Sequence, residues 1–144
     1  DTVITFLDQD GWPYEQEVEG GLRTAFGGKN GRWECYIGVS ESRQQITVLS
    51  ICPLEAPPEL HAAVAEFLHR ANYGLLVGNF ELDFNSGRVQ CRTGIDVQGG
   101  TLTTALVKNL LYLNVLLMDR YLPGITAVID DGAAPLNAIH QVEG

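Results

Sequence analysis

Three histidines are the side chains best suited to hold a metal ion, but their spacing does not bring them together. His61 and His69 lie eight residues apart in a segment with helical periodicity. On a helix this spacing turns the two side chains about 80° apart and separates them by about 12 Å along the axis. His140 lies near the end of the chain, and no cysteine or carboxylate close in sequence completes a zinc site. We therefore interpret the histidines as surface side chains and predict no metal site.

The three cysteines are the candidate nucleophiles of this chain. Cys35, Cys52 and Cys91 lie far apart, each in a segment that alternates like a strand. An odd number of cysteines without paired spacing argues against a disulfide framework and for a reducing compartment. We interpret them as buried, unreactive thiols rather than as catalytic groups.

The remaining short motifs lack residues that their chemistry requires. Asp130-Asp131-Gly132 offers two carboxylates, but the alternating oxygen ligands and the closing glutamate of a calcium loop are missing, so a turn is favoured. The glycine pairs at 20–21, 27–28 and 99–100 lack the Gly-Lys-Ser/Thr ending of a phosphate-binding loop. We therefore predict no catalytic residue and no cofactor, and hence a protein that is not an enzyme.

Charge and hydropathy limit the partners. The 144 residues carry a formal net charge of −9, with an isoelectric point near 4.6. A field of this sign repels phosphate backbones and anionic membrane surfaces, and no local cluster of lysine and arginine opposes it. We predict no nucleic-acid partner.

No segment reaches the ~20 consecutive apolar residues of a membrane span. Asn114 interrupts the best run, and Asp119 and Arg120 close it. The first ten residues are acidic and lack the basic start of a signal peptide. We predict a cytoplasmic protein without a membrane span. Because the chain does not begin with methionine, removal of a targeting segment stays open as an alternative.

Apolar periodicity predicts one α+β domain over residues 1–144, with a short helical tail from about residue 133. Asn30-Gly31 and Ser86-Gly87, taken as two-residue hairpin loops, place Phe26 opposite Cys35 and Phe84 opposite Val89. Strands joined by short hairpins form an antiparallel sheet, and helices then cover one face. The predicted order is α-β-β-β-α-β-β-α, with helices at 1–10, 58–72 and 101–122 and strands at 22–26, 33–39, 45–52, 80–84 and 89–95.

The segment 101–122 is predicted to form a helix that is apolar on more sides than one core requires. Its leucines at 106, 110, 113 and 117 form a stripe expected to face the sheet, and Pro123 is expected to kink or end the helix. A helix that is apolar nearly all round is buried on both sides, so the second side is predicted to bind another copy or a partner. The residues assigned to this interface are Tyr112, Val115, Leu116, Asp119 and Arg120.

Two details of this predicted interface follow from residue type. Asp119 and Arg120 are interpreted as an ion pair that fixes the register of the dimer. Val115→Asp is expected to split the dimer and to leave the monomer folded.

Three runs of residues carry a resemblance to a known family. They are Asn72-Tyr73-Gly74-Leu75-Leu76-Val77-Gly78, Phe80-Glu81-Leu82-Asp83 and Met118-Asp119-Arg120-Tyr121-Leu122-Pro123-Gly124-Ile125. They resemble the YbjN family, and in particular its uncharacterised cyanobacterial branch, over roughly residues 1–130 and in the same order of elements. The family is described as bacterial sensory transduction regulators. Its fold is similar to that of type III secretion chaperones, which are small, acidic, dimeric α+β proteins that hold segments of other polypeptides. The resemblance implies no catalytic residue.

Together these features predict a non-enzymatic protein-interaction module, chaperone-like or regulatory, that acts as a homodimer and binds a further protein. Two alternatives stay open. One is a small-molecule-sensing regulator with a pocket between the sheet and the helices, which requires convergent polar groups inside. The other is that the long helix is the central core helix, covered on all sides by its own chain.

Overall fold

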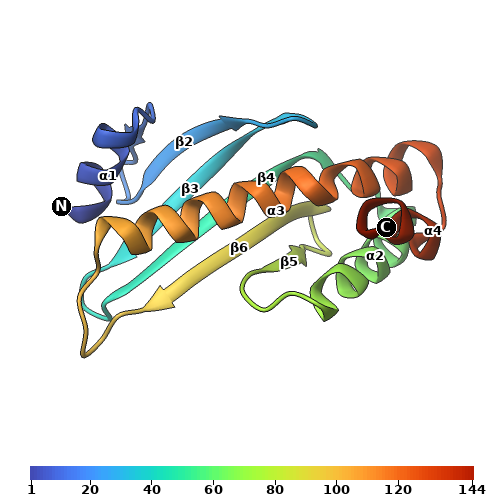
Figure 1. Ribbon diagram of the computed structural model, residues 1–144. Helices are drawn as coiled ribbons and strands as arrows, with labels where there is room; N and C mark the ends of the chain where they lie inside the picture. The colour runs from blue at the N-terminus through green and yellow to red at the C-terminus, as the bar shows by residue number, and fades with distance from the viewer.

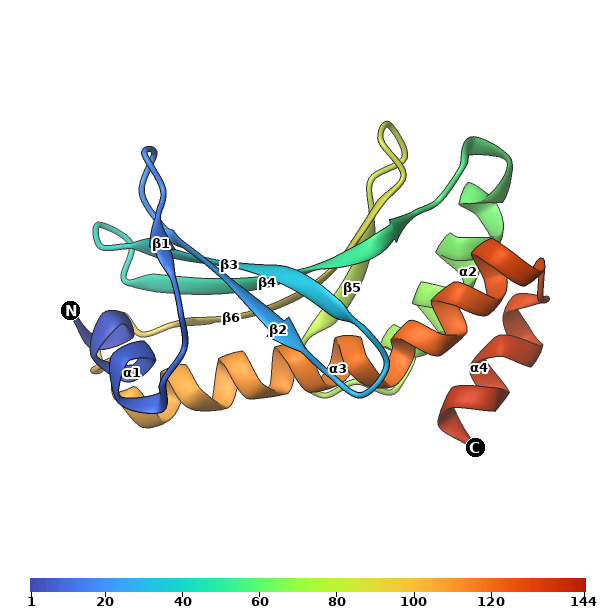
Figure 2. The ribbon, with the colours of Figure 1, turned by 90° about the horizontal axis from the view of Figure 1, so that it is seen from above.

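One long helix lies along one face of a six-stranded sheet, and the shorter helices gather at its two ends (Figures 1 and 2). The computed structural model describes all residues, Asp1–Gly144. The long helix is α3 (Thr104–Asp131); α1 (Thr2–Asp10) packs near its start, and α2 (His61–Tyr73) and α4 (Pro135–Glu143) pack near its end. The opposite face of the sheet is uncovered. This is the predicted α+β arrangement, with the helices on one face.

All neighbouring strands of the sheet are antiparallel, in the order β1-β2-β3-β4-β6-β5. Alternate residues of a strand point to opposite faces, and the buried residues of each long strand are those that point toward α3. The two-residue β1 is an addition to the predicted order. The strand bounds are β1 (Glu15–Gln16), β2 (Leu22–Gly27), β3 (Arg32–Ser40), β4 (Gln45–Glu55), β5 (Asn79–Leu82) and β6 (Arg88–Asp96).

The register of both hairpins differs from the prediction by two residues. Phe26 pairs with Trp33 rather than with Cys35. In the second hairpin Leu82 pairs with Val89, which leaves residues 83–87 as the loop. The predicted two-residue loops were wrong because both loops are longer. A slip of two residues keeps the paired side chains on their predicted faces, but Phe84, predicted to pair with Val89, leaves the strand and is 63% exposed.

The start and the orientation of α3 also differ from the prediction. The helix begins after Thr103, whose Oγ1 accepts the N–H of Leu106 at 3.2 Å as an N-cap. Leu110 and Leu117 are buried as predicted, but Leu106 and Leu113 are only half-buried. The fully buried line runs through Val107, Leu111, Val115, Met118 and Ile125. The sheet and the other helices bury this side of α3, so it is the central core helix of the monomer. Neither α3 nor any other helix is long and apolar enough to cross a membrane.

Pro123 lies inside α3 without ending it. Proline has no N–H to donate to the carbonyl four residues earlier, which belongs to Asp119. That carbonyl instead accepts a hydrogen bond from Nδ2 of Asn30 at 2.8 Å. The carboxylate of Asp119 accepts the backbone N–H groups of Lys29 and Asn30 at 3.0 and 2.8 Å. The loop between β2 and β3 therefore replaces the missing helical hydrogen bond, and α3 continues to Asp131.

The helices α2, α3 and α4 meet around Gly124. A Cβ atom at this position would lie 2.3 Å from Cζ of Phe67, so only glycine allows α3 to approach α2 this closely. The ring of Phe67 lies edge-on to that of Tyr121, whose hydroxyl donates to Glu143 at 2.7 Å. The C-terminal helix thus closes the core at this end.

The edge strand β5 is capped by a side chain of α2. Nδ2 of Asn72 donates to the carbonyl of Phe80 at 2.9 Å, and Oδ1 of Asn72 accepts the N–H of Phe80 at 2.7 Å. These are the two hydrogen bonds that a residue of a neighbouring strand would supply. The side chain therefore occupies the outward-facing backbone groups at the centre of β5.

Candidate functional site

The structure separates the five predicted interface residues. Leu116 and Arg120 are exposed on the side of α3 that faces away from the sheet, and Leu116 is 56% exposed. Val115 is 0% exposed in the core beneath the sheet. An aspartate at Val115 would bury a charge and unfold the monomer, so this substitution does not test association. An interface role for the exposed residues stays a prediction.

Tyr112 and Asp119 bind other parts of their own chain. The hydroxyl of Tyr112 donates to Oδ2 of Asp10 at 2.5 Å, and Nε1 of Trp12 donates to the same oxygen at 2.8 Å. These hydrogen bonds, from Tyr112 first and then from Trp12, lower the pKa of Asp10. Asp119 holds the loop between β2 and β3, and its carboxylate forms no ion pair with Arg120. Both side chains therefore stabilise the monomer.

A group of exposed apolar side chains lies beside the outer side of α3. Tyr73, the last residue of α2, is 92% exposed, and Leu76 and Val77, in the segment that joins α2 to β5, are 100% and 50% exposed. The segment is held against α3 at Gly78, where a Cβ atom would lie 3.0 Å from Cδ1 of Leu117. Leu116, the residue before Leu117, is 56% exposed on the outer side of α3. We call Tyr73, Leu76, Val77 and Leu116 the loop–helix surface.

Sequence reasoning missed the loop half of this surface. The available signal was the run Leu75-Leu76-Val77 between Gly74 and Gly78, which is apolar but belongs to no helix or strand. An apolar run in a connecting segment has no core position assigned by periodicity. Its exposure is therefore an observation of the structure alone.

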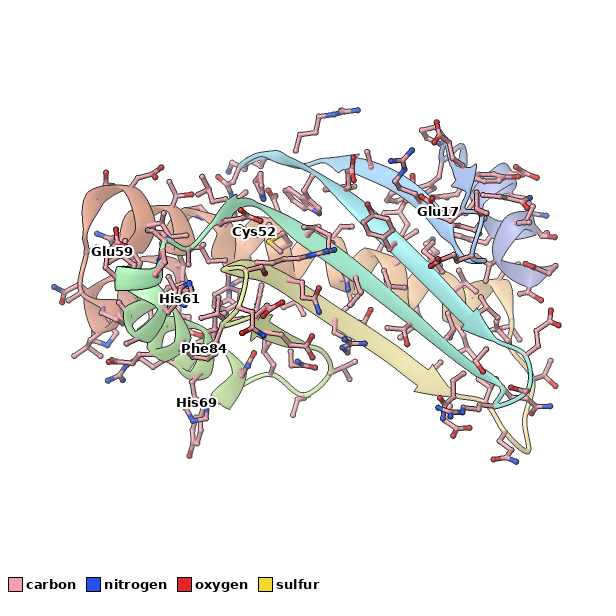
Figure 3. The ribbon with its side chains drawn as sticks, turned by 180° about the vertical axis from the view of Figure 1, so that it is seen from behind. Glu17, Cys52, Glu59, His61, His69 and Phe84 are labelled. Carbon is pink, nitrogen blue, oxygen red and sulfur yellow. The ribbon has the colours of Figure 1, made fainter.

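The histidines lie on separate surfaces. Nε2 of His61 is 3.0 Å from the carbonyl oxygen of Ala56, and its ring stands edge-on to Phe84 at 5.8 Å between centroids. Figure 3 shows His69 further along the same helix, pointing to solvent. No group of three or more histidine, cysteine, aspartate or glutamate side chains has a geometry that could hold a metal ion.

The three thiols are free and buried, as the sequence predicts. Burial in the core raises the pKa of Cys35 and of Cys52 to about 11, and that of Cys91 to about 12. The thiolate is the reactive form of cysteine, so a raised pKa and a closed environment both suppress its chemistry.

We expect the folded protein to resist thiol-specific reagents. At about pH 8 the thiolate fraction of each buried cysteine is small, because its pKa lies well above that of a free thiol. With dithionitrobenzoate, absorbance should rise only after guanidinium unfolds the chain, and all three cysteines should then react. A Ser42→Cys variant, with its new thiol in the exposed loop between β3 and β4, is the positive control. Rapid labelling of the native wild-type chain would contradict the burial of the thiols.

The uncovered face of the sheet carries paired charges. Arg92 donates through Nε to Glu81 at 3.0 Å, and Arg23 lies within ion-pair distance of Glu15 and Glu17. Burial acts to raise the pKa of Glu81, but hydrogen bonds, of which that from Arg92 is the largest, lower it overall. Three of the five main hollows of the molecule lie on this face, and the other two lie near the start of α1. None of these five lies between the sheet and α3.

Two solved structures with the same fold define the structural class. The crystal structure of YbjN from E. coli, named there "a putative transcription regulator", matches with a TM-score of 0.65 at 17% sequence identity, over 83% of this chain and 84% of that one. The crystal structure of the ExsC–ExsE complex matches with a TM-score of 0.54 at 17% identity, over 85% of this chain and 91% of that one. The Yersinia pestis type III secretion chaperone SycH, solved with a fragment of YscM2, matches at a TM-score of 0.49 and 11% identity, over 79% and 91%, which is too distant to carry an argument.

The sequence itself assigns the family. The model of the YbjN family, described as "putative bacterial sensory transduction regulator", matches residues 1–127. The chain therefore belongs to the YbjN family, as the three sequence runs indicate. No curated protein is similar enough in sequence to add to this assignment.

Proposed function

We propose that the protein is a cytoplasmic, non-enzymatic interaction module, chaperone-like or regulatory, and that it works as a homodimer. The observation that carries the proposal is the loop–helix surface. Large apolar side chains exposed side by side on a monomer mark an interaction site, whereas single exposed ones need no explanation. Its four members are exposed by half or more on a chain whose net charge of −9 otherwise favours solvation.

Three further observations support binding rather than catalysis. The thiols are buried with raised pKa values, and the histidines stand apart from one another. Free thiols also support the proposed cytoplasmic location, because the cytoplasm is a reducing compartment. Among the proteins with the same fold, E. coli YbjN is named as a regulator, and ExsC was solved in complex with ExsE. A binding role for this chain is consistent with both.

We propose that the homodimer forms through the loop–helix surface, with Arg120 at its rim. Leu116 lies on the outer side of α3, and Leu76 is fully exposed in the adjacent loop. On contact with a second copy, these side chains would leave water, which is the main favourable term in association. Arg120, whose guanidinium lies 5.2 Å above the ring of Tyr121, remains at the polar edge.

We expect the double variant Leu76→Asp, Leu116→Asp to be a folded monomer. Wild-type protein should show twice the 15.7 kDa of one chain in light scattering after gel filtration, and the variant should show the mass of one chain. Loss of two central apolar contacts typically weakens an interface by about 2 kcal/mol or more, close to 30-fold. Val18→Asp, at a fully exposed valine in the β1–β2 hairpin, is the matched control and should remain dimeric. A monomeric wild type, or a dimeric double variant, would refute this assignment.

The alternative of a small-molecule sensor with a pocket between the sheet and the helices has less support. The space between them is occupied by a core of 30 buried apolar side chains. A ligand-binding cavity requires room and convergent polar groups. Nδ2 of Asn114 and Oγ1 of Thr93, both buried there, are hydrogen-bonded to the protein itself, and Oδ1 of Asn114 is the one buried polar side-chain atom of this core without a partner.

A further inference from the structure

A hollow of about 380 Å³ lies on the uncovered face of the sheet, on the side away from α3. It spans β3, β4 and β6 where the pairing of β4 with β6 is interrupted between Ile51 and Glu55. Figure 3 looks onto this face, with Cys52 labelled on the strand beneath the hollow. The apolar part of its lining includes Ile51 and Pro53, beside the ring of Tyr36.

Two arginines of the hollow have no partner in the protein. None of the four ion pairs of the molecule includes Arg32 or Arg88, and neither guanidinium donates a hydrogen bond. Nε of Arg88 is buried and unpartnered. By contrast, Arg92 on the same face is paired with Glu81. A buried donor without an acceptor is costly, so an acceptor that reaches Nε of Arg88 from outside the chain would be stabilised there.

The acidic side chains of the hollow accept no hydrogen bond from Arg32 or Arg88. Glu55 is the cross-strand neighbour of Arg88, yet no ion pair joins them. Glu34 also lines the hollow, and its carboxylate accepts a hydrogen bond from the hydroxyl of Tyr36 at 2.9 Å. The two arginines and two glutamates make the hollow neutral as a whole, with unused donors on the arginines.

We propose that this hollow binds a small monocarboxylate with an apolar body. A guanidinium presents its N–H groups in a planar fork that matches the two oxygens of a carboxylate. The apolar body of such a ligand would lie on Ile51 and Pro53. Glu34 and Glu55 repel a doubly charged anion such as phosphate more strongly than a singly charged one. This site goes beyond the proposed interaction module and lies on the opposite face of the sheet from α3.

The probe is sodium benzoate, titrated into ¹⁵N-labelled protein at constant ionic strength. Saturable amide shifts are expected in β3, β4 and β6 around Arg32, Ile51 and Arg88. Benzamide, which has the same ring without the charge, should produce no saturable shift, and inorganic phosphate should bind more weakly than benzoate. Absence of saturable shifts with benzoate, equal binding of benzamide, or tighter binding of phosphate would overturn the proposal.

Substitutions of Arg88 test whether benzoate binds in this hollow. Arg88→Gln should raise the dissociation constant for benzoate about tenfold or more, the loss expected for hydrogen bonds to a charged group. Arg88→Lys, which keeps the charge but loses the fork, should also weaken binding and guards against a folding defect in the first variant. Arg70→Gln, at an arginine paired with Glu66 on α2, is the control and should bind as wild type does. Unchanged affinity in both Arg88 variants would refute the site, whatever the oligomeric state.

Discussion

Asn114→Asp is expected to destabilise the folded chain by about 4 kcal/mol at about pH 7. The side chain of Asn114 is fully buried, and its Nδ2 donates to the carbonyls of Val48 and Cys91 at 2.8 and 3.0 Å and to the hydroxyl of Thr93 at 3.2 Å. Aspartate has the same shape but would aim an oxygen at these acceptors. Since a buried anion there costs still more, the carboxyl must stay protonated against an ordinary pKa of about 3.9.

This penalty has a definite dependence on pH. The folded-state pKa of the new carboxyl is raised above its unfolded value, so the loss of stability is greatest at neutral pH. It shrinks by about 1.4 kcal/mol for each pH unit as the pH falls toward about 4. Urea unfolding followed by circular dichroism at several pH values measures it. Asn109→Asp makes the same charge change at an exposed position of α3 and should cost little. Equal losses for the two variants would show that Asn114 is not held as described.

Gly87→Ala is the second substitution with a large expected effect. Gly87 has a φ of +81°, and a Cβ atom there would lie 2.1 Å from the carbonyl oxygen of Ala56. Because that oxygen belongs to the backbone, relief requires the β5–β6 hairpin to move away from the end of β4. The Gly87 carbonyl also accepts the N–H of Ala56 at 2.8 Å, and this bond would be lost. The clash, the lost hydrogen bond and the left-handed backbone together should lower the free energy of unfolding by about 3 kcal/mol or more.

Gly99→Ala separates the cost of the left-handed backbone from the cost of the clash with Ala56. Gly99 has a similar φ of +84°, but nothing lies within 4 Å of the position of its Cβ atom. Its substitution should cost only the backbone strain, about 1 kcal/mol. The difference between the two midpoints in urea therefore measures the clash with Ala56. Similar midpoints would mean that the hairpin is not held against β4. Gly87 also precedes Arg88, so its substitution should disturb the hollow on the uncovered face.

The alternation of apolar and polar residues was enough to predict the strands and their faces, but not their register. Asn-Gly and Ser-Gly indicate where a hairpin turns, while the length of its loop depends on contacts remote in sequence. In the first hairpin the loop is widened by its hydrogen bonds to Asp119 on α3. The same contacts explain why Pro123 does not end the helix. A local pattern could not reveal either outcome, because the partner residues lie about ninety positions away.

The orientation of α3 shows a different limit of prediction from the sequence. A helix with leucine, valine and methionine on nearly every side has no single apolar direction, so the predicted stripe was rotated away from the true one. Val115 was therefore assigned to an interface although it is buried, while Leu116 and Arg120 were correctly expected on the surface. Asn114 was interpreted only as a polar break. Its spacing with Leu110, Leu111 and Leu117 was the available sign that it lies on the buried side.

The amide of Asn72 also limits how copies of this chain can assemble. A protein whose sheet is open at both edges resembles a bifunctional monomer in polymer chemistry, because each added copy offers a new growing end. Here the centre of the β5 edge is already hydrogen-bonded to Asn72, and the opposite edge strand, β1, has only two residues. Such a chain can pair with another copy through at most one edge of its sheet. Strand pairing by itself would therefore join at most two copies.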